Sequence, residues 1–185
     1  AFILSPMATE IERQTIAWLA ELMEMPGQSG GILVSGGNMA NLVCFMAARA
    51  AAAPAARETR LGRISQELTA YASTETHTWI NKAADVCGLG SSAIRQIPID
   101  EHYRMRADVL RERIQQDVEQ GKRPFIVIAT AGTVSVGAID PLVEIPDICR
   151  KYKVWLHVDG AYGAPAAMLA DAPADLKALR DADSL

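Results

Sequence analysis

Four short runs of apolar residues recur along the chain, and segments with helical spacing separate them. The runs cover residues 68–73, 93–98, 125–130 and 154–158, and the helical segments cover residues 77–87, 107–120 and 142–152. A strand that is apolar on both sides is buried on both sides, which is typical of a parallel sheet with helices on its two faces. The sequence therefore predicts an α/β fold with a mainly parallel sheet flanked by helices, and functional residues at the carboxyl ends of the strands.

A further apolar run leads into a glycine-rich turn near the start of the chain. Residues 30–34 are expected to form a short strand, and an alanine-rich helical pattern runs from the turn to residue 53. Gly36 and Gly37 allow close approach of the backbone, Asn38 can cap the helix, and the free N–H groups of a helix start favour a phosphate. The turn matches neither the P-loop nor the dinucleotide-binding fingerprint, so an ordinary strand-to-helix connection is an open alternative.

Two polar side chains follow other predicted strands. His77 stands in the turn after residues 68–73, where its ring can cap the next helix, lie in solvent or stack on a planar cofactor. Asp159 follows the run 154–158 and opens a turn of small residues. Its carboxylate needs a cationic partner, but a metal pair with His157 and a cap for the next helix are equally open readings.

The composition fits one globular domain and argues against several kinds of partner. Half of the 185 residues are hydrophobic, and the net charge is −4 without a basic cluster, which argues against nucleic acid. Three cysteines lie far apart without a Cys-x-x-Cys pair, so neither a disulfide framework nor a zinc site is expected, and free thiols suit a cytoplasmic protein. The apolar stretch 41–56 contains Arg49 and is too short to span a membrane, and no signal peptide is expected.

Taken in order, the segments resemble the group II pyridoxal-phosphate-dependent amino acid decarboxylases, the family of the aromatic-L-amino-acid and glutamate decarboxylases. Residues 35–42 (Ser-Gly-Gly-Asn-Met-Ala-Asn-Leu) resemble the family's Ser-Gly-Gly-Ser-x-Ala-Asn-Leu loop. His77 with residues 82–84 is similar to its His-x-Ser-x-x-Lys-Ala-Ala segment. Residues 129–134 resemble its Ala-Thr-x-Gly-Thr-Thr strand end, and residues 157–162 its His-Val-Asp-Ala-Ala-Tyr. The resemblance extends over the whole chain.

The resemblance implies the large domain of fold-type I enzymes and pyridoxal 5'-phosphate as cofactor. In the family the matching aspartate pairs with the pyridine nitrogen, and the matching histidine and alanine lie on the two faces of the ring. The catalytic residues implied here are therefore His77 and Asp159. The implied cofactor-binding residues are Gly36, Gly37, Asn38, His77, Thr133, Asp159 and Ala161. Asn38, Val134 and Gly160 depart from the family's Ser, Thr and Ala, and Val134 lacks the hydroxyl of a second threonine.

The family's Schiff-base lysine follows the aspartate in an Asn-Pro-His-Lys-like motif, and the lysines of this chain stand in other contexts. Residues 182–184 (Ala-Asp-Ser) resemble the segment just ahead of that lysine. We therefore expect residues 1–185 to be part of a large cofactor-binding domain that lacks its N-terminal segment, its catalytic-lysine segment and a C-terminal small domain. Such a piece is expected to be inactive by itself.

The function expected of the whole protein is decarboxylation of an L-amino acid, most readily an aromatic one. Two alternatives stay open: a related pyridoxal-phosphate enzyme such as an aldehyde synthase or a carbon–carbon lyase, and a lysine-less binding or dimerisation module. The resemblance also implies a homodimer. An apolar cluster in the expected helix 6–24 is read as core by default, with a dimer interface as the alternative; it comprises Trp18, Leu19, Leu22 and Met23.

Overall fold

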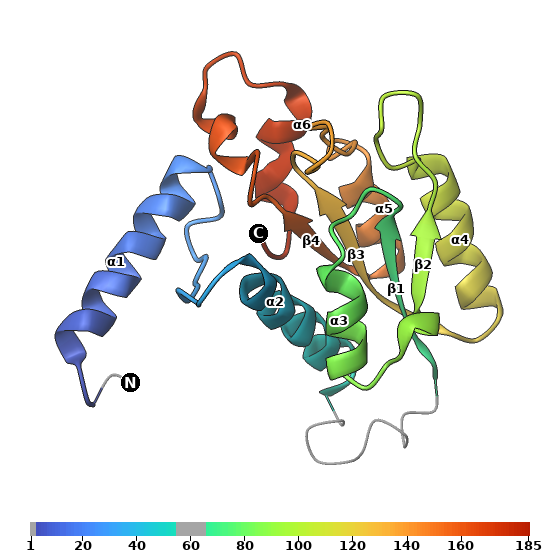
Figure 1. Ribbon diagram of the computed structural model, residues 1–185, viewed down its shortest axis with the longest axis horizontal. Helices are drawn as coiled ribbons and strands as arrows, with labels where there is room; N and C mark the ends of the chain where they lie inside the picture. Colours follow the sequence, from blue (N-terminus) through green and yellow to red (C-terminus); the bar gives the residue numbers. More distant parts are fainter. Residues whose placement is uncertain (1–2, 55–65) are drawn as a thin grey trace.

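The computed structural model describes residues 3–54 and 66–185 and shows one parallel sheet between two layers of helices (Figure 1). The sheet has four strands in the order β2-β1-β3-β4, all of them parallel. The strands are β1 (Leu68–Ser73), β2 (Ile94–Ile97), β3 (Arg123–Thr130) and β4 (Trp155–Asp159). The longer helices are α1 (Pro6–Leu22), α2 (Gly37–Ala52), α3 (Trp79–Val86), α4 (Ala107–Glu119) and α5 (Ile145–Tyr152), and α6 (Ala174–Lys177) is a single turn. The predicted α/β class is confirmed.

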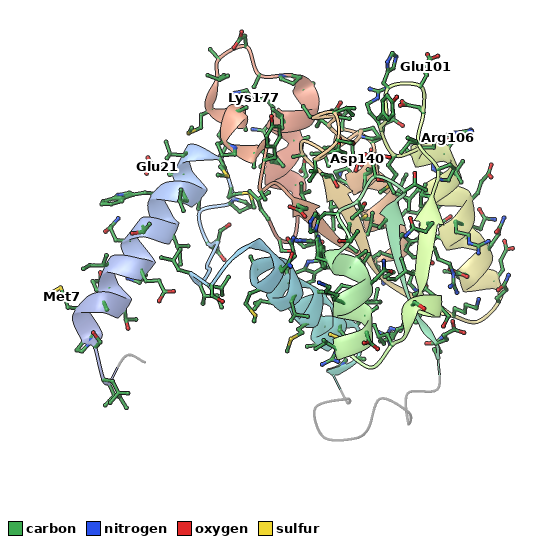
Figure 2. All side chains as sticks on the ribbon, in the orientation of Figure 1. Met7, Glu21, Glu101, Arg106, Asp140 and Lys177 are labelled. Atoms are coloured by element: carbon green, nitrogen blue, oxygen red, sulfur yellow. The ribbon has the colours of Figure 1, made fainter. Side chains whose placement is uncertain are left out.

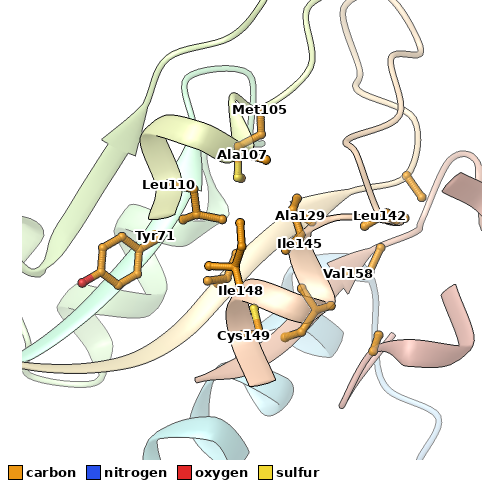
Figure 3. Close-up of a cluster of buried hydrophobic side chains, with 14 of the residues drawn as sticks. Tyr71, Met105, Ala107, Leu110, Ala129, Leu142, Ile145, Ile148, Cys149 and Val158 are labelled. Carbon is orange, nitrogen blue, oxygen red and sulfur yellow. The ribbon is translucent and has the colours of Figure 1, made fainter. Parts of the chain in front are cut away.

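Successive side chains of each strand point to opposite faces of the sheet and pack into two separate hydrophobic clusters. On one face Ile126 and Ile128 of β3 pack with Phe45 of α2 and Ile80 of α3. On the other face Val127 and Ala129 pack with residues of α4 and α5, and Figure 3 shows part of this cluster, including Tyr71, Leu110 and Ile148. Burial on both faces explains why the strands read as continuous apolar runs.

A buried carboxylate holds the chain that leaves β3. Asp140 is fully buried; its Oδ1 accepts a hydrogen bond from the backbone N–H of Met105 (2.7 Å) and its Oδ2 accepts one from the N–H of Thr130 (2.8 Å). Burial raises the pKa of Asp140 from 3.8 to about 6. The side chain thereby ties the loop before α4 to the end of β3, where the predicted site lies.

The strand predicted at residues 30–34 is wrong. These residues form neither helix nor strand, and Ile32 and Leu33 are 59% and 58% exposed. No neighbouring strand pairs with them among the residues that the structure describes. An apolar run becomes a strand only when a neighbouring strand pairs with its N–H and C=O groups. Here the N–H of Leu33 instead donates to Oε1 of Glu12 in α1 (2.7 Å). The sequence also predicts a charged, partly loop-like stretch at residues 57–67. Residues 57–65 of it lie outside the described residues.

Helix α1 stands apart from the sheet and its covering helices (Figure 1). None of its residues is buried, and its side chains, among them Met7, extend into solvent (Figure 2). Trp18, Leu19 and Leu22 are all exposed, so the reading of these residues as core is wrong for this chain. Met23 alone of that cluster packs against the core. An apolar helix surface of this kind needs cover from outside residues 3–54 and 66–185.

Candidate functional site

A cavity of about 620 Å³ lies where the start of α2 meets the carboxyl ends of β3 and β4. Its wall also includes the turn after β1 and the turn after β4. The lining residues are Ser35, Gly36, Gly37, Asn38, Met39, Asn41, Glu75, His77, Thr130, Gly132, Val134, Asp159, Ala161 and Tyr162. Ligands of parallel α/β sheets bind outside the carboxyl ends of the strands, as the sequence predicted.

Asp159 is the last residue of β4, and its two carboxylate oxygens differ in the hydrogen bonds that they accept. Oδ2 accepts hydrogen bonds from Nδ2 of Asn41 and from the indole Nε1 of Trp79, each at 2.9 Å. Oδ1 accepts only a longer one, 3.3 Å, from the backbone N–H of Ala161. The carboxylate is therefore fixed through Oδ2, and Oδ1 keeps the capacity to accept a hydrogen bond from a ligand in the cavity.

His157 lies two residues before Asp159 on β4, so both side chains leave the same face of the strand. Its Nε2 is 3.0 Å from Oδ1 of Asn41, and its Nδ1 is 2.9 Å from Oγ of Ser184. Burial lowers the pKa of His157 from 6.5 to about 4, so the ring is neutral at pH 7. Both ring nitrogens have partners within the chain, which argues against the reading of His157 and Asp159 as a metal pair.

The start of α2 supplies an open, anion-favouring surface. Gly36 is the N-cap and has φ +131°, a conformation that side chains rarely adopt. An added Cβ at Gly36 or Gly37 would meet nothing within 4 Å, so the space beside this backbone is free. The first N–H groups of a helix lack partners within it. Asn38 lies in the first turn and lines the cavity, so its predicted role as the helix cap is wrong.

His77 and Ala161 both line the cavity, although they belong to two motifs that are far apart in the sequence. His77 is exposed in the turn before α3, and its Nδ1 accepts a hydrogen bond from the N–H of Trp79 (3.3 Å). Ala161 lies in the turn after β4 and lines the cavity with a side chain no larger than a methyl group. The structure thus brings together His77, Ala161, Asp159, Asn38 and the two glycines of the turn.

Thr133 does not line the cavity. It is 1% exposed, and its Oγ1 accepts a hydrogen bond from the N–H of Ala138 (3.0 Å), which holds the turn after β3. Its predicted cofactor contact stays a prediction. Val134 does line the cavity and is 79% exposed.

Gly160 stands where the resembled family has alanine, and the packing explains the change. A Cβ there would lie 2.5 Å from Cβ of Ala164 and 2.8 Å from Cδ1 of Leu185. Both distances are far below van der Waals contact, so only glycine fits this position without a shift of its neighbours.

The sequence interpretation assigned no role to Asn41, Trp79 or Glu75, all of which lie in this region of the structure. Asn41 carried a weak signal, since it is a polar residue in the first turns of an otherwise apolar helix. Trp79 takes the place of the serine in the resembled His-x-Ser segment. Glu75 stands two residues before His77, and its Oε2 accepts a short hydrogen bond from Oγ of Ser135 (2.5 Å).

A parallel α/β sheet with an aspartate at a strand end, a glycine turn at a helix start and a cavity between them is typical of a cofactor-dependent enzyme domain. Comparison with known proteins identifies which kind: the model of the pyridoxal-dependent decarboxylase conserved domain matches residues 1–185. The chain belongs to this family.

The relatives and solved structures agree with this assignment. The chain is 40% identical over 185 residues to the aromatic-L-amino-acid decarboxylase of Bacillus atrophaeus, covering all of this chain and 37% of that protein. The crystal structure of mouse CSAD superposes with a TM-score of 0.90 at 30% identity, over 98% of this chain and 38% of that one. The 4-hydroxyphenylacetaldehyde synthase of Rhodiola rosea superposes with a TM-score of 0.81 at 31% identity, over 97% and 39%. The chain thus spans less than half the length of each.

The residues present fit pyridoxal phosphate, the cofactor of this family. The start of α2 offers free N–H groups and open space for a phosphate, and Oδ1 of Asp159, which accepts only one long bond, has capacity left for a protonated ring nitrogen. A third observation is that Oγ1 of Thr130, at the cavity wall, has no hydrogen-bond partner, alone among the buried side-chain polar atoms of the described residues. Buried polar atoms without partners are rare in native structures.

Proposed function

We propose that the full-length protein is a pyridoxal-phosphate-dependent carboxy-lyase that converts an L-amino acid, preferably an aromatic one, to the amine and carbon dioxide. The chain described here is the cofactor-binding part of its large domain. The observation that carries the proposal is Asp159, which is held through Oδ2 while Oδ1 accepts only one long bond of 3.3 Å, at a cavity that also contains a helix start suited to phosphate.

Each residue contributes a definite part. When bound, pyridoxal phosphate supplies an electron sink for the pair of electrons left on the α-carbon as carbon dioxide departs. Asp159 keeps a proton on the ring nitrogen by accepting its hydrogen bond. Residues 36–38 bind the phosphate through backbone N–H groups, and Asn38 adds a side-chain amide. His77 and Ala161 confine the ring from its two faces and so fix its orientation.

The charges of the cavity wall support an aromatic substrate over an acidic one. The described lining residues include two carboxylates, Glu75 and Asp159, and no lysine or arginine. A glutamate side chain would find no counter-charge on this wall, whereas Met39, Val134 and Tyr162 offer apolar and aromatic surface. The Bacillus relative is an aromatic-L-amino-acid decarboxylase, which agrees with this choice.

An aldehyde synthase is the second candidate, because the fold matches the Rhodiola enzyme as well as decarboxylases. The two are separated by their products when the full-length protein is incubated with L-tyrosine, L-tryptophan and L-glutamate. Both reactions release carbon dioxide. A decarboxylase also releases the amine and consumes no oxygen, whereas a synthase consumes oxygen and water and releases the aldehyde, ammonia and hydrogen peroxide. Turnover of L-glutamate alone would contradict the substrate proposal.

Asp159→Asn tests the role that carries the proposal. We expect turnover to fall by roughly 100-fold or more, because an amide cannot keep the ring nitrogen protonated as a carboxylate does. Cofactor loading is measured beside it by borohydride reduction and intact mass, which fixes the cofactor to its lysine. Near wild-type turnover at equal loading would contradict the role of Asp159.

Homodimerisation and a cytoplasmic location complete the proposal. The exposed apolar side of α1, with Trp18, Leu19 and Leu22, supports a partner surface. The three cysteines are unpaired in the structure, which suits a reducing compartment. Among the described helices, none is both long and apolar enough to cross a bilayer.

A further inference from the structure

A chain of hydrogen bonds leads from the end of the described chain to Oδ2 of Asp159, the oxygen opposite the one that faces the proposed cofactor. Trp155 donates its indole N–H to Oγ of Ser184 (2.9 Å), and Ser184 lies 2.9 Å from Nδ1 of His157. Nε2 of His157 lies 3.0 Å from Oδ1 of Asn41, whose Nδ2 donates to Oδ2 of Asp159 at 2.9 Å.

The direction of every bond in this chain is determined by its two ends. Asp159 can only accept, so Asn41 must turn its NH₂ group toward it and its Oδ1 toward His157. Oδ1 accepts, so Nε2 of His157 must carry the single proton of the neutral ring. Nδ1 is then an acceptor, and Ser184 donates its hydroxyl proton to it. All donors therefore point toward the carboxylate, and such aligned bonds strengthen one another.

Burial makes this arrangement hard to reverse. His157 is 1% exposed and Asn41 is 8% exposed, so neither can exchange its partner for solvent. If the amide of Asn41 flipped, its oxygen would face the carboxylate and its NH₂ group would face the N–H of His157, leaving buried groups unpaired. Trp79 restrains both Asp159 and His157, since its indole N–H donates to Oδ2 of Asp159 and its ring lies edge-on to the His157 ring at 6.0 Å between centroids.

We propose that His157 and Asn41 are positioning residues which, with Trp79, hold Asp159 as an ionised acceptor whose Oδ1 is presented to the pyridine nitrogen. His157 acts through Asn41: the N–H of its Nε2 donates to Oδ1 of Asn41 and so holds the amide with its NH₂ group on the carboxylate. The inference rests on the proposed function, because it assigns these residues to the binding of pyridoxal phosphate.

The test compares two ligands that differ at one atom, in the full-length protein. Dissociation constants are measured for pyridoxal phosphate and for its analogue in which the ring nitrogen is replaced by C–H. The wild type should bind pyridoxal phosphate more tightly. Asn41→Leu and His157→Phe should weaken binding of pyridoxal phosphate by roughly tenfold and leave the affinity for the analogue within about twofold. His157→Gln keeps a donor toward Asn41 and should restore most of the difference.

Control variants distinguish a loss of positioning of Asp159 from a general loss of stability. Tyr71→Phe removes a buried hydroxyl that donates to Asp117 at 2.7 Å, outside the cavity, and should lower stability without changing the ratio of the two affinities. Trp79→Phe removes the other side-chain donor to Oδ2. If His157→Phe does not fold, Trp79→Phe should show the same selective loss of affinity for pyridoxal phosphate over the analogue. Equal losses for both ligands, or no loss for either, would overturn the inference while the proposed function stands. Absence of any binding of pyridoxal phosphate by the wild type would overturn both.

Discussion

The hydroxyl of Thr130 destabilises the cofactor-free protein, because it is buried without a hydrogen-bond partner. Its Oγ1 is buried and unpaired, whereas Thr69, also buried in the same sheet, places its Oγ1 2.9 Å from the hydroxyl of Tyr71. Thr130→Val should therefore raise the free energy of unfolding of the cofactor-free protein by roughly 1 kcal/mol, and Thr69→Val should lower it by about the same amount. Denaturant unfolding of both variants checks this; a loss of stability in Thr130→Val would mean that the hydroxyl has a partner.

Gly160→Ala restores the residue of the resembled family and should nevertheless destabilise this protein. The added methyl would overlap Cβ of Ala164, and overpacking of this kind costs about 1–3 kcal/mol. The double variant Gly160→Ala with Ala164→Gly removes the closer of the two overlaps and leaves only the contact with the Leu185 side chain, so it should recover most of the loss. If thermal unfolding shows the single variant to be as stable as the wild type, the backbone at Gly160 adapts more easily than its contacts indicate.

Helix α1 carries the prediction at the scale of one element. Leu19→Glu and Leu22→Glu place charges on its exposed apolar side, while Glu21→Gln, on the same helix, removes one. If a second subunit covers this side in the full-length protein, the two leucine variants should raise the dimer dissociation constant by at least about tenfold, and Glu21→Gln should leave it unchanged. Sedimentation velocity measures this. An unchanged dimer in both leucine variants would place the interface elsewhere.

Elements that form the sheet could be predicted from the sequence because both of their faces are buried. The strand 68–73 has its predicted bounds, and β3 and β4 end at Thr130 and Asp159, within one residue of the predicted ends. Residues 30–34 have a similar composition, but no strand lies beside them to accept their backbone hydrogen bonds. Pairing is a tertiary property, so a local apolar pattern cannot report it.

The site was predictable only where a residue belongs to a recognisable motif. Asp159, His77 and the turn 36–38 meet at the cavity as expected. The partners of Asp159 were not predicted, because Asn41 and Trp79 come from helices 118 and 80 residues away in the sequence. Thr133 belongs to the motif, yet its hydroxyl serves the turn. A residue that belongs to a recognisable motif can be expected to lie near the site. Its role there depends on its hydrogen-bond partners, which the motif does not show.

At the scale of the whole molecule, two buried groups oppose each other in the dependence of stability on pH. Asp140 has a pKa raised from 3.8 to about 6, so its contribution is fully present below pH 3.8 and is lost as the pH rises through 6. His157 has a pKa lowered from 6.5 to about 4, so its contribution is present above pH 6.5 and is lost as the pH falls through 4. Between pH 4 and 6 the two slopes largely cancel.

Single variants should show the separate effects of Asp140 and His157 on the pH dependence of the free energy of unfolding. Without the Asp140 contribution, Asp140→Asn should lose stability steadily as the pH falls from 6.5 to 4, by up to roughly 3 kcal/mol. His157→Gln should instead gain stability over the same fall in pH. Urea unfolding at half-unit steps of pH measures both. Parallel profiles for the two variants and the wild type would show that neither group titrates as its surroundings imply.

The separation of the site residues along the chain also bears on how the protein is made. Asn41 and Asp159 are 118 residues apart, and the bond between them joins α2 to β4. A ribosome that has synthesised α2, β1 and β3 has therefore not yet produced the acceptor that the proposed cofactor contact needs. Under the proposed function, cofactor capture through Asp159 must follow the docking of β4, so it gives no help to the folding steps that precede it.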